Sequence, residues 1–256
     1  MNKLTPIEEY NNMLFKREDL FQRNFKGFKL NGSKLRSILD TLIIKKELIA
    51  SKYSNCIKIK AEEGSHTLIN ILYACNQLGI TIINTKKIHS PIWIDLIKDS
   101  LYKEENCCYD LAPYFAMNQR YTVPNHFSYT ANIEQVSNIP RGLDNIIISY
   151  GSSQTLIALL KGIKQYGNIP KRIIAIGNKE PNPLVFYEGF PCDHIIRCWK
   201  DYDLPKITPP IDLDSRFELN AWRYLQKYET YPEIKNKKNL FWITGNYNFL
   251  REVPFI

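Results

Sequence analysis

The chain has 256 residues, of which 44% are hydrophobic and 23% are charged, and its formal net charge is +8. This composition excludes a disordered or fibrous protein, and the length is enough to bury a full core in one large domain or in two smaller lobes. No apolar run approaches the roughly 20 residues of a membrane span. Residues 1–9 are polar and lack the apolar core of a secretory signal, so we expect a cytoplasmic protein.

The net positive charge is informative about binding partners, and the spacing of the cysteines is informative about metal sites. A net charge of +8 favours polyanionic partners such as nucleic acid, although basic runs such as 235–238 are equally typical of a solvated surface. None of the six cysteines belongs to a CxxC pair, so we predict no metal site.

The first part of the chain alternates strand and helix patterns. A short strand that turns into a polar loop is expected over 14–20, and Asn31-Gly32-Ser33 supplies a turn and a helix N-cap. Apolar residues then recur at helical spacing over 34–50. The next expected elements are a strand over 56–60, a helix that ends at Gly79 and a strand over 81–83. This order indicates a parallel sheet.

The pattern is weakest over 86–140, where only the apolar run 91–97 indicates a helix. Regular patterns return afterwards. They predict a buried strand over 145–150, a helix over 156–163, a strand over 172–177, a helix over 217–228 and a strand over 240–243.

Three strand-to-helix turns, at 31–34, 63–66 and 151–155, are rich in polar residues. In an open parallel sheet such turns gather at the carboxyl ends of the strands, where ligands bind. Backbone N–H groups and hydroxyls of the third turn are suited to a phosphate at the positive end of a helix. Small-residue turns are common before helices, and a lysine at a helix start, such as Lys34, is usually only solvent-exposed. Each turn alone is therefore weak evidence.

The order of four segments gives a more specific resemblance. Lys16-Arg17-Glu18-Asp19-Leu20, followed by Asn31-Gly32-Ser33-Lys34-Leu35-Arg36, resembles the opening of 1-aminocyclopropane-1-carboxylate deaminase and D-cysteine desulfhydrase. These are fold type II, tryptophan-synthase-β-like enzymes. The resemblance implies that Lys34 forms a Schiff base with pyridoxal 5'-phosphate. A desolvated lysine amine beside a phosphate and a carbonyl is suited to imine chemistry.

The second segment, Ser65-His66-Thr67 and onward to Leu78-Gly79-Ile80, is similar to the family's "S(G)N" helix. The resemblance places the substrate carboxylate or a proton-transfer step on Ser65, and the cofactor's 3'-oxygen on His66. Histidine is a departure from the family's asparagine and introduces a group that titrates near neutral pH. The alternative is that Ser65 only caps the helix and His66 is structural.

The third and fourth segments imply the remaining cofactor contacts. The stretch 151–159 is similar to the phosphate loop "GSGGTxAGL", which assigns phosphate binding to Gly151, Ser152, Ser153, Gln154 and Thr155. Two family glycines are replaced there, by Ser153 and Gln154, and these residues tolerate fewer backbone conformations.

The fourth segment, 242–246, resembles the terminal "SGGN" or "HTGG" segment, so Thr244 would hydrogen-bond the pyridine nitrogen. A neutral hydroxyl there would favour elimination or replacement over transamination.

Together the segments imply an abbreviated fold type II enzyme: an α/β protein with open, mostly parallel sheets flanked by helices and the cofactor in the cleft between two lobes. We expect a larger cofactor-binding domain over 1–47 and 141–256 and a smaller domain over 48–140.

The expected activity is that of a pyridoxal-phosphate-dependent lyase or deaminase acting on a small amino-acid-like substrate, and the resemblance also implies a homodimer. Two alternatives stay open. One is an enzyme of this fold acting on an amino-acid-modified pyrimidine in viral DNA. The other is a non-catalytic binding protein.

Overall fold

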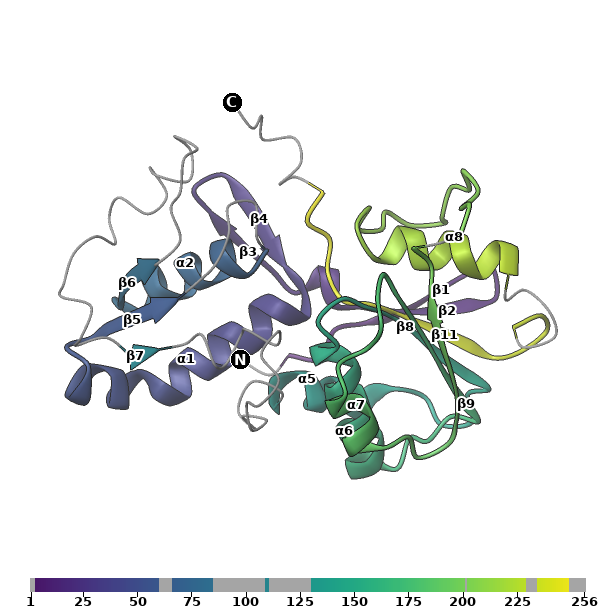
Figure 1. The fold of residues 1–256 in the computed structure, drawn as a ribbon, viewed down its shortest axis with the longest axis horizontal. Helices are drawn as coiled ribbons and strands as arrows, with labels where there is room; N and C mark the ends of the chain where they lie inside the picture. Colours follow the sequence, from purple (N-terminus) through teal and green to yellow (C-terminus); the bar gives the residue numbers. More distant parts are fainter. Residues whose placement is uncertain are drawn as a thin grey trace. The chain divides into compact units, whose positions relative to one another are not determined.

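The computed structural model describes residues 3–59, 66–84, 109–110, 130–200, 202–228 and 234–248 (Figure 1). Within these ranges, no helix combines the length and the apolar character that crossing a membrane requires.

The chain divides into two compact units. Unit 1 consists of Met1–Phe21, Asn31–Ser33 and Tyr129–Asn246, and unit 2 consists of Gln22–Leu30, Lys34–Ser128 and Tyr247–Ile256. The division passes between Ser33 and Lys34, inside helix α1 (Gly32–Lys52). The domain limits predicted from the sequence stay a prediction.

Unit 1 is built on a six-stranded sheet with the order β1-β2-β11-β8-β9-β10. β1 and β2 are antiparallel, and the other neighbouring strands are parallel. The predicted open, mostly parallel sheet is therefore confirmed. The strands are β1 (Ile7–Tyr10), β2 (Met13–Arg17), β8 (Asn145–Tyr150), β9 (Arg172–Gly177), β10 (Asp193–Cys198) and β11 (Asn239–Ile243).

Helices cover both faces of this sheet. Helix α8 (Glu218–Tyr228) lies on one face, and α5 (Thr130–Glu134), α6 (Gln154–Tyr166) and α7 (Leu184–Glu188) lie on the other (Figure 1). Strands β8 and β11 are buried along their whole length, which explains their nearly continuous apolar sequences.

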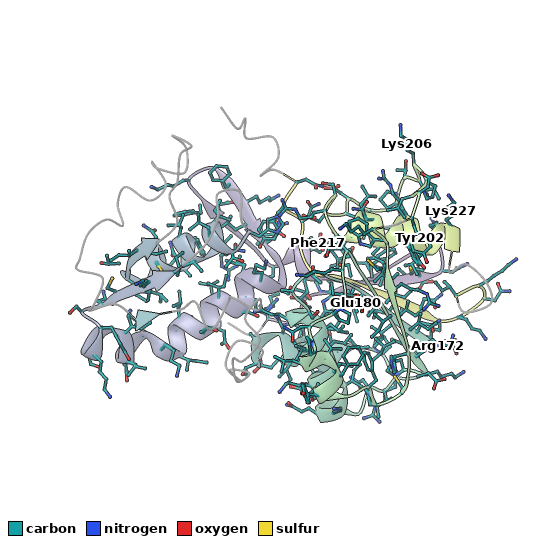
Figure 2. The ribbon with its side chains drawn as sticks, viewed as in Figure 1. Arg172, Glu180, Tyr202, Lys206, Phe217 and Lys227 are labelled. Carbon is teal, nitrogen blue, oxygen red and sulfur yellow. The ribbon has the colours of Figure 1, made fainter. Side chains whose placement is uncertain are left out.

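The packing under α8 is largely aromatic. The ring of Trp222 packs on Phe15 and Phe241, with centroids 5.8 Å away in both cases. Tyr202 packs edge to face on Tyr224 of α8, with centroids 4.9 Å apart (Figure 2). These contacts fix α8, and with it the first residue of the helix, against the sheet.

Unit 2 contains two small sheets. Strands β3 (Gln22–Phe25) and β4 (Phe28–Asn31) form a pair, while β5 (Cys56–Ile59), β6 (Thr81–Asn84) and β7 (Tyr109–Asp110) form a parallel sheet of order β6-β5-β7. Among its described residues, the helices are the greater part of α1 and α2 (His66–Leu78). Gly79 follows α2 with φ +66°, as expected for a residue that ends a helix.

The predicted elements that fall on described residues are present, with ends shifted by a few residues. The strands β1, β3, β4, β7 and β10 and the helices α5 and α7 were not predicted. The helix predicted over 91–97 lies outside the described residues.

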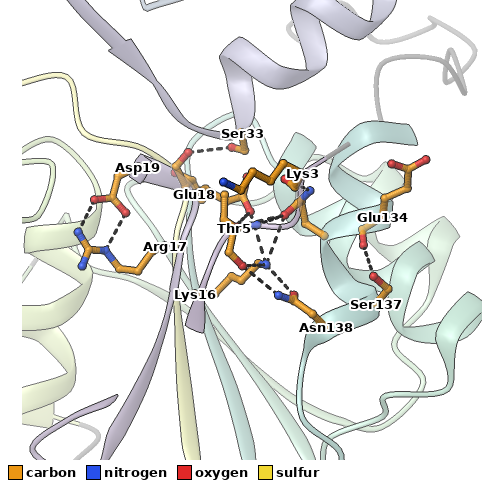
Figure 3. A network of polar contacts seen from close by, with 12 residues as sticks. Lys3, Thr5, Lys16, Arg17, Glu18, Asp19, Ser33, Glu134, Ser137 and Asn138 are labelled. Atoms are coloured by element: carbon orange, nitrogen blue, oxygen red, sulfur yellow. Dashed lines mark hydrogen bonds and ion pairs between the residues drawn. The ribbon is translucent and has the colours of Figure 1, made fainter. Parts of the chain in front are cut away.

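A buried polar network joins β2 to the chain before β1 and to the 3-10 turn Gln135–Asn138 (Figure 3). The side chains of Lys16 and Glu18 are 0% exposed. Lys16 Nζ donates to Thr5 O at 2.8 Å and to Asn138 Oδ1 at 2.7 Å, and lies 3.9 Å from Glu18 Oε1. Thr5 Oγ1 donates to the same Glu18 oxygen at 2.5 Å. Lys16 and Glu18, which belong to the first sequence segment, thus contribute to the packing of unit 1.

Candidate active site

The candidate site of unit 1 lies at the carboxyl edge of its parallel strands. Residue Trp242 of β11 is paired with Ile148 of β8, so both strands end at the same edge. Thr244 comes directly after β11, and the loop 151–153 comes directly after β8. The third and fourth sequence segments therefore meet, as the topology of a parallel sheet predicts.

Ser33 links both segments to the start of α1. Its backbone N–H donates to Thr244 O at 2.7 Å, and its hydroxyl donates to the same oxygen at 3.0 Å. The Ser33 hydroxyl also lies 3.2 Å from Thr155 Oγ1, where either oxygen can be the donor. Lys34 is bonded to Ser33 and is the third residue of α1. The backbone from which Lys34 extends is thus anchored to Thr244 and to the first turn of α6.

A second anchor is made by Asn31. Its side-chain amide donates to Asn246 O at 2.6 Å, and its Oδ1 accepts from Asn246 N–H at 2.7 Å. The side chain of Asn246 donates in turn to Asp212 Oδ2 at 2.7 Å. Asn31 and Asn246 were not predicted as site residues, although both lie inside the motif segments. A side-chain amide that satisfies a distant backbone donor and acceptor leaves no local sequence pattern.

The segment 151–155 adopts a glycine-like conformation at Ser153, where the resembling family has glycine. Ser153 precedes α6 with φ 66° and ψ 3°, in the left-handed region. Its hydroxyl accepts from Asn182 N–H at 3.0 Å. The first hydrogen bond of α6 runs from Ile157 N–H to Ser153 O at 3.0 Å, so the preceding N–H groups have no acceptor within the helix. A helix start of this kind can bind an anion.

The other end of the loop is tightly packed. A Cβ on Gly151 would lie 2.7 Å from the ring of Phe217, a residue labelled in Figure 2. Ser152 is exposed, whereas Ser153 is buried, and Gln154 and Thr155 begin α6. The backbone at Gly151 therefore lies close to the Phe217 ring, although two of the family's glycines are absent from the loop.

Replacing Ser153 tests the conformation of this loop. We expect Ser153→Gly to be more stable than Ser153→Ala by about 1–2 kcal/mol, because both lose the Asn182 contact and only alanine retains the left-handed strain. The free energies of unfolding in urea give the comparison. Equal stabilities would show that the backbone at position 153 is not left-handed.

Thr244 is held by a buried acid. Its backbone N–H donates to Glu218 Oε1 at 3.0 Å, and its hydroxyl donates to the same oxygen over a shorter distance. Glu218 is the first residue of α8 and is 1% exposed. Burial, and then the nearby Asp214, raise the pKa of Glu218 to about 8 from an ordinary value of 4.5. Sequence analysis missed Glu218, because an acid in the first turn of a helix is common.

The raised pKa of Glu218 predicts a stability that falls with pH. The folded protein binds the Glu218 proton more tightly than the unfolded chain, so this group stabilises the fold fully below pH 4.5. That contribution is lost as the pH rises through about 8. The loss is of the order of a few kcal/mol, since one pKa unit corresponds to about 1.4 kcal/mol.

The matched variant is Glu218→Gln, which keeps the size of the side chain and an acceptor oxygen. We expect its unfolding free energy to fall less than that of the wild type between these two pH values. Parallel pH profiles from urea titrations of the two proteins would contradict the assignment.

The second sequence segment lies in unit 2. His66 is the first residue of α2, and its ring stacks on Tyr247, with centroids 4.0 Å apart and an angle of 19° between the planes. The Tyr247 hydroxyl accepts from Asn70 Nδ2 at 2.7 Å, and Asn70 is wholly buried one turn after His66. Ser65 lies outside the described residues. The cofactor contact of His66 and the roles of Ser65 stay predictions.

Comparison with known structures identifies the fold. The crystal structure of an ACC deaminase homologue matches 95% of this chain and 89% of its own, with a TM-score of 0.61 and 17% identity. An L-serine ammonia-lyase from Rhizomucor miehei matches 98% of both chains, with a TM-score of 0.61 and 12% identity. Threonine deaminase isoform 2 from Solanum lycopersicum matches 94% of this chain and 78% of its own, with a TM-score of 0.59 and 13% identity.

No protein-family model and no curated protein matches the sequence. The chain nevertheless has the fold of the fold type II pyridoxal-phosphate enzymes, which confirms the predicted fold class. The ACC deaminase homologue, at 17% identity, is of the same kind as the deaminase whose opening segments this sequence resembles. At identities this low the likeness establishes the fold, and the chemistry has to be argued from the site.

Proposed function

We propose that this chain is a pyridoxal-phosphate-dependent lyase or deaminase that acts on an amino-acid-like substrate through Lys34. The observation that carries the proposal is the anchoring of Ser33, the neighbour of Lys34, to both Thr244 and Thr155. It links the lysine segment of the chain to the two segments that the resemblance assigns to the ring nitrogen and the phosphate.

The residues of unit 1 fit this cofactor. The start of the 13-residue helix α6 offers N–H groups without an intrahelical acceptor, beside the exposed Ser152. A Cβ on Gly32 would collide with the backbone of Thr244 and Gly245, and a Cβ on Gly151 would collide with the ring of Phe217, so both positions require a residue without a side chain. Hydroxyls, backbone N–H groups and a lysine amine are the donor set that a phosphorylated aldehyde requires.

Each residue then has a distinct role in the proposed reaction. When bound, pyridoxal phosphate supplies an electron sink for charge at the substrate's α-carbon. The Lys34 amine holds the cofactor and then moves the α-proton, the 151–155 loop and the start of α6 hold the phosphate, and Thr244 orients the ring. Ser65 is proposed to bind the substrate carboxylate or assist proton transfer, and His66 to contact the 3'-oxygen.

The test is cofactor attachment in wild type and Lys34→Ala. We expect protein purified with pyridoxal phosphate to be yellow, and borohydride reduction followed by peptide mapping to find the adduct on Lys34. Lys34→Ala should lose the visible band completely, because no amine remains at that position to bind the aldehyde. Lys46→Ala is the matched control, since Lys46 is an exposed lysine of the same helix.

Two outcomes would overturn the proposal. An unchanged spectrum in Lys34→Ala would show that the lysine has no part in cofactor attachment. A colourless wild type without an adduct would favour a cofactor-free binding protein with this fold.

The net charge of +8 favours a second candidate, in which the amino-acid-like group is carried on a pyrimidine of DNA. Binding to duplex DNA should then be measurable at low salt and should weaken steeply as salt is added. The reason is that a bound protein releases counterions from the DNA, and added salt opposes this release. Absence of binding at low salt would exclude this candidate and leave the small-molecule substrate.

A further inference from the structure

The positive charge of the chain is concentrated in unit 2. The 34 Lys and Arg residues divide into 16 in unit 2 and 18 in unit 1, while the 26 Asp and Glu residues divide into 10 and 16. Unit 2 therefore has a net charge of +6 and unit 1 a net charge of +2, although unit 2 is the shorter of the two. A charge that is distributed in this way attracts a polyanion to one part of the molecule.

Within unit 2, strands β3 and β4 form a basic two-stranded ribbon over residues 22–31, called the β3–β4 ribbon below. It presents three exposed cations: Arg23 from β3, Lys26 from the turn and Lys29 from β4. The sequence contains no Asp or Glu between positions 20 and 39. The ribbon thus has one cation on each of its parts and no acid of its own to neutralise them.

One face of the ribbon packs on unit 2, and the other is polar. Phe25 is 7% exposed, and its ring packs edge to face on Tyr73 of α2, with centroids 5.7 Å apart (Figure 1). Side chains alternate between the two faces along a strand. Asn24 and Lys29 are exposed and adjoin the buried Phe25 and Leu30, so they lie on the opposite face. That face presents an amide and a cation to solvent.

The turn of the ribbon keeps a cation in spite of its backbone conformation. Lys26 has φ 46°, in the left-handed region that asparagine and glycine adopt more easily. Its Nζ lies 5.9 Å from the centroid of the Phe25 ring, so the side chain lies over the ring and its ammonium stays at the surface. The tip of the ribbon therefore carries positive charge.

We propose that the β3–β4 ribbon binds the phosphate backbone of duplex DNA, with Arg23, Lys26 and Lys29 as the phosphate contacts. Lys and Arg neutralise phosphates, and an exposed amide such as that of Asn24 can donate to phosphate oxygens. A two-stranded ribbon also has the dimensions to enter the major groove of B-DNA. The inference deepens the second candidate function, in which a pyrimidine of DNA carries the substrate group, and it does not depend on the role of Lys34.

The test measures the fluorescence anisotropy of a labelled DNA duplex, titrated with the full chain at a series of salt concentrations. The binding constant of the wild type should fall linearly with salt on logarithmic axes. The ribbon variant combines Arg23→Gln, Lys26→Asn and Lys29→Gln, with asparagine at 26 because it tolerates a positive φ. Its slope should be shallower by about 2–3, since each lost phosphate contact removes about 0.9, and its affinity at low salt should fall about tenfold or more.

The matched control removes three cations from the basic run of unit 1, as Lys235→Gln, Lys237→Gln and Lys238→Gln, all at exposed positions. It has the same net charge as the ribbon variant, so a general effect of charge would lower both slopes equally. We expect the control to keep the wild-type slope. Equal losses in the two variants, or an unchanged slope in the ribbon variant, would contradict the inference.

Two further measurements keep the inference testable. If the ribbon variant does not fold, Lys29→Gln alone should reduce the slope by about 0.9, and an unchanged slope would overturn the inference. Vesicles of phosphatidylcholine and phosphatidylserine distinguish DNA from an anionic membrane, which attracts the same cations. A ribbon variant that loses vesicle binding and keeps DNA binding would assign the ribbon to a membrane and overturn the inference.

Failure of the inference and failure of the proposed function have different signatures. A wild type that carries the reduced adduct on Lys34 but binds no DNA at low salt would overturn the inference and leave the lyase or deaminase standing. A wild type that binds DNA through the ribbon but forms no adduct would leave the inference standing and overturn the role of Lys34.

Discussion

Gly32→Ala is expected to destabilise unit 1 by about 3–5 kcal/mol and to abolish the proposed cofactor attachment at Lys34. The added Cβ would lie 2.4 Å from Thr244 O and 2.7 Å from the Cα of Gly245, and neither atom belongs to a flexible side chain. The φ of +87° adds the cost of a left-handed conformation to that collision. To relieve this collision, the start of α1 would have to move away from Thr244. That movement would break both hydrogen bonds from Ser33 to Thr244 O.

Gly27→Ala is the matched control for this variant. Gly27 has nearly the same φ, +84°, but no atom of the described residues lies within 4 Å of its added Cβ. It should therefore cost only the backbone term, about 1–2 kcal/mol, and leave cofactor attachment intact. Urea unfolding and borohydride adduct yield would be measured for both variants. Similar losses in both would show that the approach of Gly32 to Thr244 is not as close as described.

The elements that sequence patterns predicted are those whose burial dictates their composition. β8 and β9 are buried central strands, and their isoleucine runs admit few other interpretations. Within the described part of the chain β10 pairs with β9 alone, and it mixes polar with apolar residues, so its sequence carries no such signal. The β3–β4 pair was missed because its turn is Lys26-Gly27, and a lysine with φ 46° is not a turn residue that composition suggests.

The site was predictable in part, for a different reason. Lys34, Thr155 and Thr244 lie in segments whose order resembles a known family, so their grouping could be expected from the chain alone. Glu218 and Asn31 each make two hydrogen bonds to a residue that lies 26 or 215 positions away in the sequence. Such bonds depend on how α8 and the strand ends are placed, and they have no periodic pattern in the sequence. The contacts of Glu218 and Asn31 could therefore be found only in the structure.

Lys16→Met is expected to lower the free energy of unfolding by about 3–5 kcal/mol, the range for removing one partner of a buried ion pair. Methionine has nearly the volume of the lysine stem, so the loss is electrostatic and not a cavity. The variant removes the cation that lies 3.9 Å from Glu18 Oε1, and the Glu18 side chain is 0% exposed. It also removes the donor of the 2.7 Å hydrogen bond to Asn138 Oδ1 (Figure 3). The buried Glu18 carboxyl and the half-buried Asn138 amide would each lose a charged partner.

Two further variants separate the ion pair from the general effect of losing a lysine. Lys29→Met, at an exposed position of β4, should change stability by no more than about 0.5 kcal/mol. Lys16→Met combined with Glu18→Gln should recover part of the loss, because the remaining network then contains no uncompensated buried charge.

Urea titrations at neutral pH of the wild type, Lys16→Met, Glu18→Gln and the double variant supply the four free energies of this cycle. The double variant could lose more unfolding free energy than the two single variants lose together. The network would then be held by its hydrogen bonds to Thr5 and Asn138 and not by the charge pair. The Lys16–Glu18 pair would then act only as a donor and an acceptor. In either case Lys16 stabilises the sheet at β2, and the proposed chemistry begins only at Lys34.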